Sequence, residues 1–208
     1  MKFIILVEGS NDRVFLSEIL KRTAAPNIFP LFYPNKGTKS VKKDKETVLL
    51  RSFCGNAKSH NLIVKEEGGH DFVIDLFVNL VVNFLMNHDD IYLTVLFDHD
   101  GRTPEAEIDK INNDLKAKTS KKIEFKLISP KSRIIEGLYR RDFSLCQHNG
   151  DNIREVTKFS FVSFDMSLEY AVSKFCKKSK KGINQNDVIA FASSIKFNDL
   201  ISNPTPFP

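Results

Sequence analysis

Three carboxylates stand directly after two apolar segments of this 208-residue chain. Glu8 follows the run from Phe3 to Val7, and Asp98 and Asp100 follow the run from Ile91 to Phe97. Uninterrupted runs of β-branched, aliphatic and aromatic residues are typical of strands that are buried on both faces. Parallel sheets bind ligands at the carboxyl ends of their strands, so acids at these positions are candidates for chemistry.

The two aspartates have a spacing that suits a shared ligand. In an extended backbone residues i and i+2 point the same way, so Asp98 and Asp100 can present both carboxylates to one spot while His99 turns aside. Oxygen ligands without nearby Cys or His at metal-ligand spacing favour Mg²⁺ or Mn²⁺. We therefore expect Glu8, Asp98 and Asp100 to gather one hard cation. The alternative is that the aspartates only begin a turn before a helix.

Strands and helices alternate along the part of the chain that must position these acids. Strands are expected at residues 3–7, 61–65, 91–97 and 123–128, and helices at 10–20, 72–85 and 103–115. Thr103-Pro104-Glu105 is typical of a helix start, because it offers a cap, a proline in the first turn and an acid near the positive helix end. Parallel neighbours need crossover connections, which the helices supply. The sequence therefore predicts an α/β domain at residues 1–129, with a four-stranded parallel sheet and flanking helices.

Two regions depart from this alternation. Residues 25–59 contain prolines, glycines and a lysine cluster, which indicates an insertion or long loop. Beyond Pro130 the alternation stops, and helical patterns at 133–141, 167–177 and 187–195 surround an ambiguous segment at 159–164. We expect residues 130–208 to form a mainly helical C-terminal appendage.

The segments ILVEGSNDRVFLSEIL and TVLFDHDGR, separated by a helix that starts after Gly-Gly, resemble the Toprim domain. This family includes type IA and II topoisomerases, bacterial primases, OLD-family nucleases, a ribosomal RNA maturase and recombination-mediator proteins. The resemblance covers residues 1–129, and the family's acidic pattern maps onto Glu8, Asp98 and Asp100. It implies a Rossmannoid fold in which Glu8 is a general acid or base or a metal ligand and the aspartates hold Mg²⁺. The long lysine-rich insertion departs from the family.

The resemblance also implies roles for residues outside this triad. OLD-like members have a second acid at the place of Asp12, so a two-metal site is implied as an option; a helix N-terminal acid stabilised by the dipole is the alternative. Arg133 and Glu136, in SPKSRIIEGLYRR, resemble the segment that follows the last Toprim strand in some OLD-like proteins. Glu136 would then complete the metal shell, although a surface helix position explains it equally well.

Basic residues point to a polyanionic partner. The chain has 31 Lys and Arg against 26 Asp and Glu, a net charge of +5. Two lysine clusters stand out, namely Lys36, Lys39, Lys42, Lys43, Lys45 and Lys177, Lys178, Lys180, Lys181. Such clusters suit nucleic-acid phosphates, and the alternative for each is a solvated loop. We expect nucleic-acid contacts from the first cluster, from Arg102 and from Arg133.

The compartment is expected to be a reducing cytoplasm. The three cysteines are odd in number and form no C-x-x-C pair, which argues against a disulfide framework or a zinc ribbon. The first apolar run is too short for a signal peptide, and no stretch approaches the ~20 apolar residues of a membrane span. No membrane partner is expected.

These features predict Mg²⁺-dependent chemistry on nucleic-acid phosphodiesters, by a small nuclease or a primase-like nucleotidyl transferase. The alternative is a non-catalytic nucleic-acid-binding adaptor with a vestigial site, as the resemblance to recombination mediators implies; the intact Glu8, Asp98 and Asp100 argue against it. Receiver and phosphatase domains also place acids after parallel strands. A receiver, however, has its acidic pair after the first strand and a single aspartate after the third, which is the reverse of this pattern.

Overall fold

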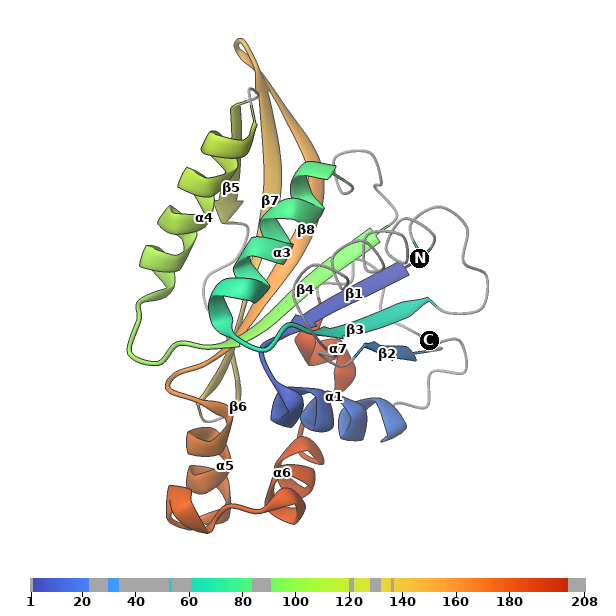
Figure 1. Ribbon diagram of the computed structural model, residues 1–208, viewed down its shortest axis with the longest axis vertical. Coiled ribbons are helices and arrows are strands. Elements are labelled where there is room, and N and C mark those ends of the chain that lie inside the picture. Colours follow the sequence, from blue (N-terminus) through green and yellow to red (C-terminus); the bar gives the residue numbers. More distant parts are fainter. Residues whose placement is uncertain are drawn as a thin grey trace.

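The computed structural model describes residues 2–22, 30–33, 53, 61–83, 91–119, 122–127, 132–135 and 137–201. They form one mostly parallel sheet with helices on both faces (Figure 1). The strands are β1 Lys2–Val7, β2 Pro30–Tyr33, β3 Leu62–Glu66, β4 Ile91–Asp98, β5 Lys122–Leu127, β6 Ser132–Ile135, β7 Leu138–Asn149 and β8 Asn152–Phe164. The helices are α1 Ser10–Arg22, α3 His70–Asn83, α4 Pro104–Lys118, α5 Leu168–Cys176, the 3₁₀ turn η2 Lys180–Gly182, α6 Gln185–Ala192 and α7 Phe197–Leu200.

The order of the strands creates a switch point in the sheet. The order is β2-β3-β1-β4-β8-β7-β5, and β6 pairs with β7 outside this path. The strands from β2 to β8 in this order run parallel, whereas β7 is antiparallel to β8, β5 and β6. The chain moves from β1 to β3 on one side and then crosses to β4 on the other. The carboxyl ends of β1 and β4 therefore flank a topological switch point, where open α/β sheets bind ligands.

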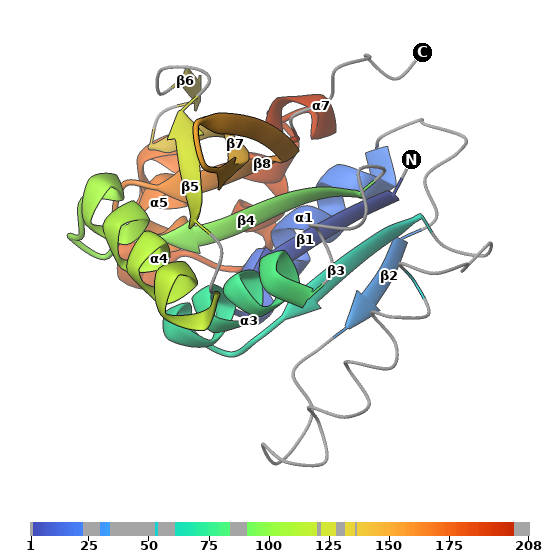
Figure 2. The same cartoon turned by 90° about the horizontal axis from the view of Figure 1, so that it is seen from above.

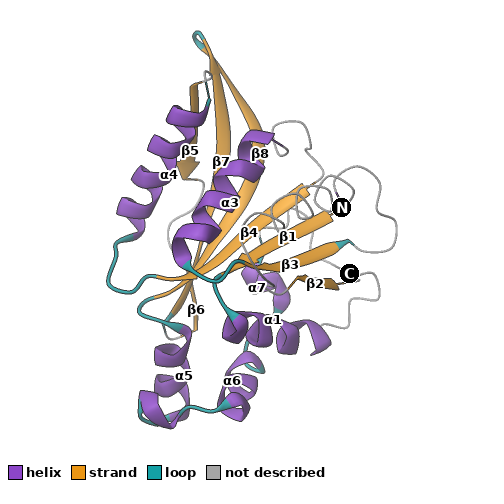
Figure 3. Ribbon diagram, viewed as in Figure 1, coloured by secondary structure: helices purple, strands orange, loops and turns teal. Residues whose placement is uncertain are grey.

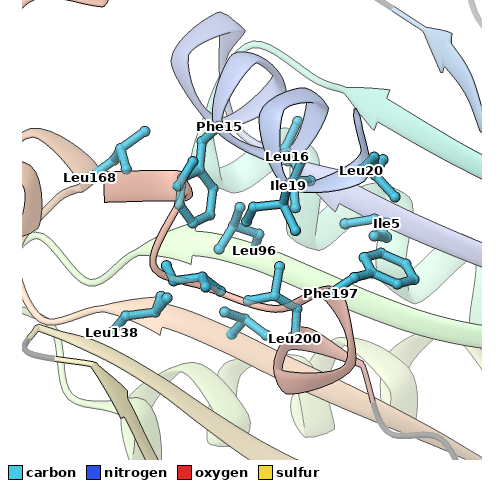
Figure 4. Packing of buried hydrophobic residues seen from close by; sticks show 14 of the residues in the cluster. Ile5, Phe15, Leu16, Ile19, Leu20, Leu96, Leu138, Leu168, Phe197 and Leu200 are labelled. Atoms are coloured by element: carbon cyan, nitrogen blue, oxygen red, sulfur yellow. The ribbon is translucent and has the colours of Figure 1, made fainter. Parts of the chain in front are cut away.

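Alternate residues of the central strands face two hydrophobic cores. In β1, Ile4 and Leu6 belong to the core under α3 and α4, while Phe3, Ile5 and Val7 belong to the core under α1, α5, α6 and α7. Figure 2 shows α3 and α4 on one face of the sheet and α1, α5 and α7 on the other. Side chains of α1, β4, β7 and α7 meet in the second core (Figure 4). Burial on both faces explains why β1 has no polar interruption.

The predicted elements of the first domain form. The strands expected at 3–7, 61–65 and 91–97 are β1, β3 and β4, and the helices expected at 10–20, 72–85 and 103–115 are α1, α3 and α4. The cap of α4 also forms as predicted, because Thr103 Oγ1 accepts a hydrogen bond from the Ala106 backbone N–H at 3.3 Å. The α/β class is therefore confirmed.

The predicted four-stranded sheet is wrong, since the described residues form eight strands in one sheet. The segment predicted at 123–128 becomes a strand, β5, but it lies at the sheet edge and pairs antiparallel with β7. The place beside β4 is taken by β8, which runs parallel to it from Leu93 opposite Phe159 to Asp98 opposite Phe164. Which strand lies beside which is a long-range property that local pattern does not encode.

The mainly helical interpretation of residues 130–208 is wrong for its first part. The helix predicted at 133–141 is replaced by β6 and the start of β7, and the ambiguous segment at 159–164 is the end of β8 (Figure 3). Gly137 separates β6 from β7 with a φ of +79°, which ends any helical run there. The helices predicted at 167–177 and 187–195 form as α5 and α6.

The predicted insertion at 25–59 is described only in part. It contributes β2, a parallel strand beside β3, and Phe53, which is buried in the core under α3 and α4. The cluster from Lys36 to Lys45 lies outside the described residues, as does Glu136. Among the helices that are described, none combines the length and apolar composition needed to cross a bilayer.

Candidate functional site

The parallel ends of β1 and β4 bring Glu8 and Asp98 together. The two strands are in register up to Val7 opposite Leu96. One residue further, the backbone N–H of Asp98 donates a hydrogen bond to Glu8 Oε1 at 3.0 Å. The main chain of Glu8 is fixed from the other side, since the Gly68 N–H donates to its carbonyl at 2.8 Å. The predicted proximity of Glu8 and Asp98 is confirmed.

The loop between β8 and α5 completes this edge of the sheet. The backbone N–H of His99 donates to Phe164 O at 3.1 Å, and that of Asp100 donates to Met166 O at 3.0 Å. These bonds extend the pairing of β4 with β8 beyond both strands. The segment after Asp98 is therefore held against the start of α5 by main-chain contacts.

The first turn of α5 contacts the acids directly. The backbone N–H of Leu168 donates to Asp98 Oδ1 at 3.1 Å, so the positive end of the helix faces this carboxylate. Glu169 adds a further acid, whose charge contributes to the raised pKa of Asp98. Its own pKa would be raised by burial, but hydrogen bonds led by the 2.8 Å contact from Asn11 Nδ2 lower it below its usual value.

Asp12 lies in the first turn of α1 and belongs to the same cluster. Its Oδ2 accepts a hydrogen bond from the Gly9 N–H at 2.9 Å, which agrees with the expectation of an N-terminal helix acid. The side chain is buried, with 6% of the residue exposed. Burial, followed by the charge of Asp98, raises its pKa well above the usual range. Asp12 thus stabilises the start of α1 through the Gly9 N–H and is also a member of the carboxylate cluster.

Asp100 does not extend β4 as expected. It has a φ of +47°, in the left-handed region, and Gly101 follows with a φ of +82°. The turn is closed by the Arg102 N–H, which donates to His99 O at 2.8 Å. The expected alignment of Asp98 and Asp100 on an extended strand is therefore wrong, and the turn alternative describes the backbone better. Asp100 is exposed, although its charge is still among those that raise the pKa of Asp98.

The cluster carries uncompensated negative charge. Burial and the charges of Glu8 and Glu169 raise the pKa of Asp98 to about 7. Among the described residues, no lysine or arginine forms an ion pair with Asp12, Asp98 or Asp100. The neighbouring cations have other partners: Arg13 pairs with Glu66 at 2.9 Å, Lys65 with Glu67 at 2.5 Å and Arg102 with Glu107 at 3.6 Å. A cation from solution would relieve this repulsion.

Three of the acids share one hydrogen-bonding pattern. Glu8, Asp12 and Asp98 each accept a backbone N–H with one oxygen, namely Oε1, Oδ2 and Oδ1. Within the described residues, the second oxygen of each makes no hydrogen bond. The backbone contacts hold the carboxylates in place, and the second oxygens remain available to a ligand.

The donor set fits a hard cation by its chemistry but does not form a finished cage. Carboxylate oxygens are the preferred ligands of Mg²⁺ and Mn²⁺. As the side chains lie, no group of three or more His, Cys, Asp or Glu residues in the described ranges is arranged to hold a metal ion. Mg²⁺ usually takes one or two carboxylates and completes its shell with water and substrate oxygens, so it does not require such a cage.

His70 and Glu107 connect the cluster to the other face of the sheet. His70 Nδ1 lies 3.0 Å from Glu8 Oε1, and His70 Nε2 lies 2.9 Å from Glu107 Oε2. The side chains of His70 and Glu107 are only 9% and 5% exposed. Burial alone would lower the pKa of His70, but the hydrogen bonds to the two glutamates outweigh it and raise the pKa. The two glutamates therefore favour the protonated form of His70.

Sequence analysis missed His70, Glu107 and Glu169. His70 begins α3 directly after the end of β3, and Glu169 lies in the first turn of α5 after the end of β8. Both follow the carboxyl end of a parallel strand, which is the signal that identified Glu8 and Asp98. That signal was available for His70, because β3 was predicted. It was not available for Glu169, because β8 was not.

The remaining predicted residues lie away from the acids or border them. Arg102 is exposed beside the cluster and pairs with Glu107, and Arg133 is exposed on β6. The second lysine cluster follows α5, with Lys177 at the C-cap and Lys180 in η2.

Removing the His70 side chain should destabilise the protein by about 2–4 kcal/mol, because among the described residues it leaves the buried Glu107 carboxylate with only the 3.6 Å contact to Arg102. In the His70→Ala background, Glu107→Gln removes that charge and should recover at least half of the loss. Urea unfolding of both variants measures this coupling. Lys110→Ala is a matched control, because it breaks an exposed pair with Asp71 between the same two helices and should change little. Equal losses in the single and double variants would contradict the role given to His70.

The chain is an α/β protein with a carboxylate cluster at the switch point of its parallel sheet. Comparison with protein-family models, curated proteins and solved structures gives no match. What the chain does is therefore inferred from this cluster and its surroundings.

Proposed function

We propose that this protein catalyses Mg²⁺- or Mn²⁺-dependent chemistry on nucleic-acid phosphodiesters, as a nuclease or as a primase-like nucleotidyl transferase. The observation that carries the proposal is the hydrogen-bonded approach of Glu8 and Asp98 at the switch point, with Asp12, Asp100 and Glu169 as further carboxyl groups around them. The resemblance of Glu8, Asp98 and Asp100 to the acids of the Toprim family supports the same reaction class.

Each acid has a role that follows from its surroundings. Asp98 and Glu8 would hold the cation, with Asp12 and Asp100 as additional oxygen ligands. When bound, the cation would neutralise phosphate charge and lower the pKa of a bound water. Glu8 is oriented through Oε1 by the Asp98 N–H and by His70, which leaves Oε2 to accept or return a proton. The Asp98 N–H can still donate to Oε1 when the Glu8 side chain is protonated, so this contact holds the side chain in place in both states.

One assay separates the reaction types. Purified protein is incubated with labelled single- and double-stranded DNA and RNA, with Mg²⁺, Mn²⁺ or EDTA, and with or without nucleoside triphosphates. Shortened products that need a metal identify a nuclease, and extended products that need triphosphates identify a nucleotidyl transferase. Both should disappear in EDTA.

The second candidate is a nucleic-acid-binding adaptor without catalysis. The observation in its favour is that no group of three metal-ligating side chains is preassembled among the described residues. An adaptor would bind nucleic acid equally well in Mg²⁺ and in EDTA and would leave every substrate unchanged. That result would replace the catalytic proposal.

A further inference from the structure

Exposed lysines gather where α5 ends. The exposed members are Lys174 in the last turn of α5, Lys177 at its C-cap, and Lys180 and Lys181 in η2. The 3₁₀ turn packs against α5, so Lys180 and Lys181 belong to an element that neighbours this helix. We call these four lysines, together with Phe175, the α5–η2 surface. Within the described part of the chain, none of the four pairs with an acid.

Lys178 shows what a neutralised lysine in this region looks like. Its Nζ lies 2.6 Å from Asp187 Oδ1, and Asp187 in turn caps the start of α6. The contact fixes the connection between α5 and α6. Lys174 Nζ lies over the Tyr170 ring, 5.3 Å from its centroid, while Lys177, Lys180 and Lys181 form no ion pair within the described residues. The positive charge of these lysines is therefore not neutralised by an acid and is open to a partner.

The backbone at Lys177 is also unusual for a lysine. It has a φ of +53°, in the left-handed conformation that normally favours glycine at a helix C-terminus. A cation near this end is favoured by the helix dipole, which accounts for Lys174 and Lys177. The dipole acts only within the last turn, so it gives no account of Lys180 and Lys181. A polyanionic ligand accounts for all four.

Phe175, in the last turn of α5 between Lys174 and Lys177 in the chain, is an exposed aromatic residue. The residue is 42% exposed, while its ring packs edge-on against Phe191 with a centroid separation of 5.5 Å. The Phe175 ring is therefore held in place by Phe191 and is still partly exposed to solvent. Aromatic rings among basic side chains bind the bases and the backbone of single-stranded nucleic acids together.

α5 connects this surface to the carboxylate cluster. Its first N–H bonds to Asp98, and its nine residues span about 13 Å at the helical rise of 1.5 Å per residue. Lys180 is close enough to Glu169 for its charge to contribute to the lowered pKa of that acid.

We propose that the α5–η2 surface binds the phosphate backbone of a single-stranded nucleic acid and directs the strand along α5 to the carboxylate cluster. That the nucleic acid reaches the carboxylate cluster rests on the proposed function, whereas its binding to the α5–η2 surface does not require catalysis. The partner is a flexible polyanion with bases that can stack, which fits a single strand better than a duplex.

The test compares two double variants that lose the same charge at two helix ends. Lys180→Gln with Lys181→Gln alters the α5–η2 surface, and Lys116→Gln with Lys118→Gln alters the exposed end of α4. Binding of a fluorescent 20-nucleotide oligo-dT is measured by anisotropy in EDTA over a series of salt concentrations. The surface variant should bind about 25-fold more weakly in 0.1 M salt, and its salt slope should fall by about 1.4, since each phosphate contact contributes about 0.7. The α4 variant should match the wild type.

Phe175→Leu probes the stacking contribution separately. It keeps an apolar contact to Phe191 but removes the ring, so affinity should fall about tenfold without a change in salt slope. Unchanged thermal unfolding of the variants excludes misfolding as the cause.

The outcomes distinguish this inference from the proposed function. If the Lys180/Lys181 variant binds oligo-dT with the affinity and salt slope of the wild type, the proposed role of the α5–η2 surface is wrong, even if metal-dependent turnover is found. Binding that depends on this surface, with no turnover in any metal, would overturn the proposed function and leave the surface standing. If the Lys180/Lys181 variant loses binding to anionic phosphatidylserine vesicles but binds the oligonucleotide like the wild type, the surface binds a membrane and the proposal is wrong.

Discussion

Asp98→Asn is expected to lower metal-dependent turnover at least about 1000-fold, because it removes a charged ligand from a cation that contributes several kcal/mol to the transition state. The fold should survive, since an asparagine Oδ1 can still accept the Leu168 N–H. Glu8→Gln should be equally inactive but retain measurable Mg²⁺ binding, because the proposed role of Glu8 is proton transfer as much as coordination. Asp100→Asn tests whether the exposed aspartate of the turn joins the metal site.

Calorimetric Mg²⁺ titration alongside the activity assay separates these roles. Glu155→Gln, an exposed acid on β8, is the control and should behave like the wild type. If Asp98→Asn and Glu8→Gln both bind Mg²⁺ and process nucleic acid normally, the catalytic interpretation of the cluster is wrong. If Asp98→Asn is inactive but gives the same Mg²⁺ titration as the wild type, the metal binds at a different site.

In EDTA, Asp98→Asn should also stabilise the protein at pH 8, by about 2–3 kcal/mol. The pKa of Asp98 rises from its ordinary 3.8 to about 7 on folding, which corresponds to an upper figure of about 4 kcal/mol, reduced here for solvent contact. A group with a raised pKa in the folded state holds a proton that the unfolded chain releases. Between about pH 4 and pH 7 the free energy of unfolding of the wild type therefore falls as pH rises.

Urea unfolding from pH 5 to pH 8 measures this effect. Asp98→Asn should already be somewhat more stable than the wild type at pH 5, because the unfolded Asp98 is ionised above about pH 4, and the difference should grow towards pH 8. Saturating Mg²⁺ at pH 8 should remove the difference, because an ion that binds only the folded wild type stabilises it by about 2.7 kcal/mol at 100 times the dissociation constant. Parallel curves at all pH values would show that the Asp98 carboxyl carries no such strain.

Most strands and helices of residues 1–129 could be predicted because their signals are local, although β2 inside the predicted insertion was not. Burial on both faces makes β1 and β4 continuously apolar, and the cap formed by Thr103 is encoded within four residues. The hairpin of β7 and β8 could not be predicted in the same way. The pairing of Leu93 with Phe159 joins residues far apart in the chain, and neither segment shows its partner.

The site was predictable to the same extent as the strands that carry it. Glu8 and Asp98 follow recognised strands, so their contact could be expected. Asp100 was placed on the wrong backbone, because the left-handed turn depends on main-chain bonds from the loop after β8. Glu169 was missed for the same reason, since it owes its place to β8.

The insertion of β8 beside β4 also affects how the chain is made. Leu168 donates to an aspartate 70 residues earlier, so at 5–20 residues per second about 4–14 seconds pass on the ribosome between the synthesis of the two. Until β8 emerges, β4 has one unpaired edge, which could pair with a strand of another nascent chain. The acids that follow β1 and β4 have been synthesised before this interval ends, but the start of α5, which faces Asp98, is the last part of the cluster to be made. We therefore expect nascent chains stalled before residue 152 to aggregate or to recruit chaperones, and to lack a competent carboxylate cluster.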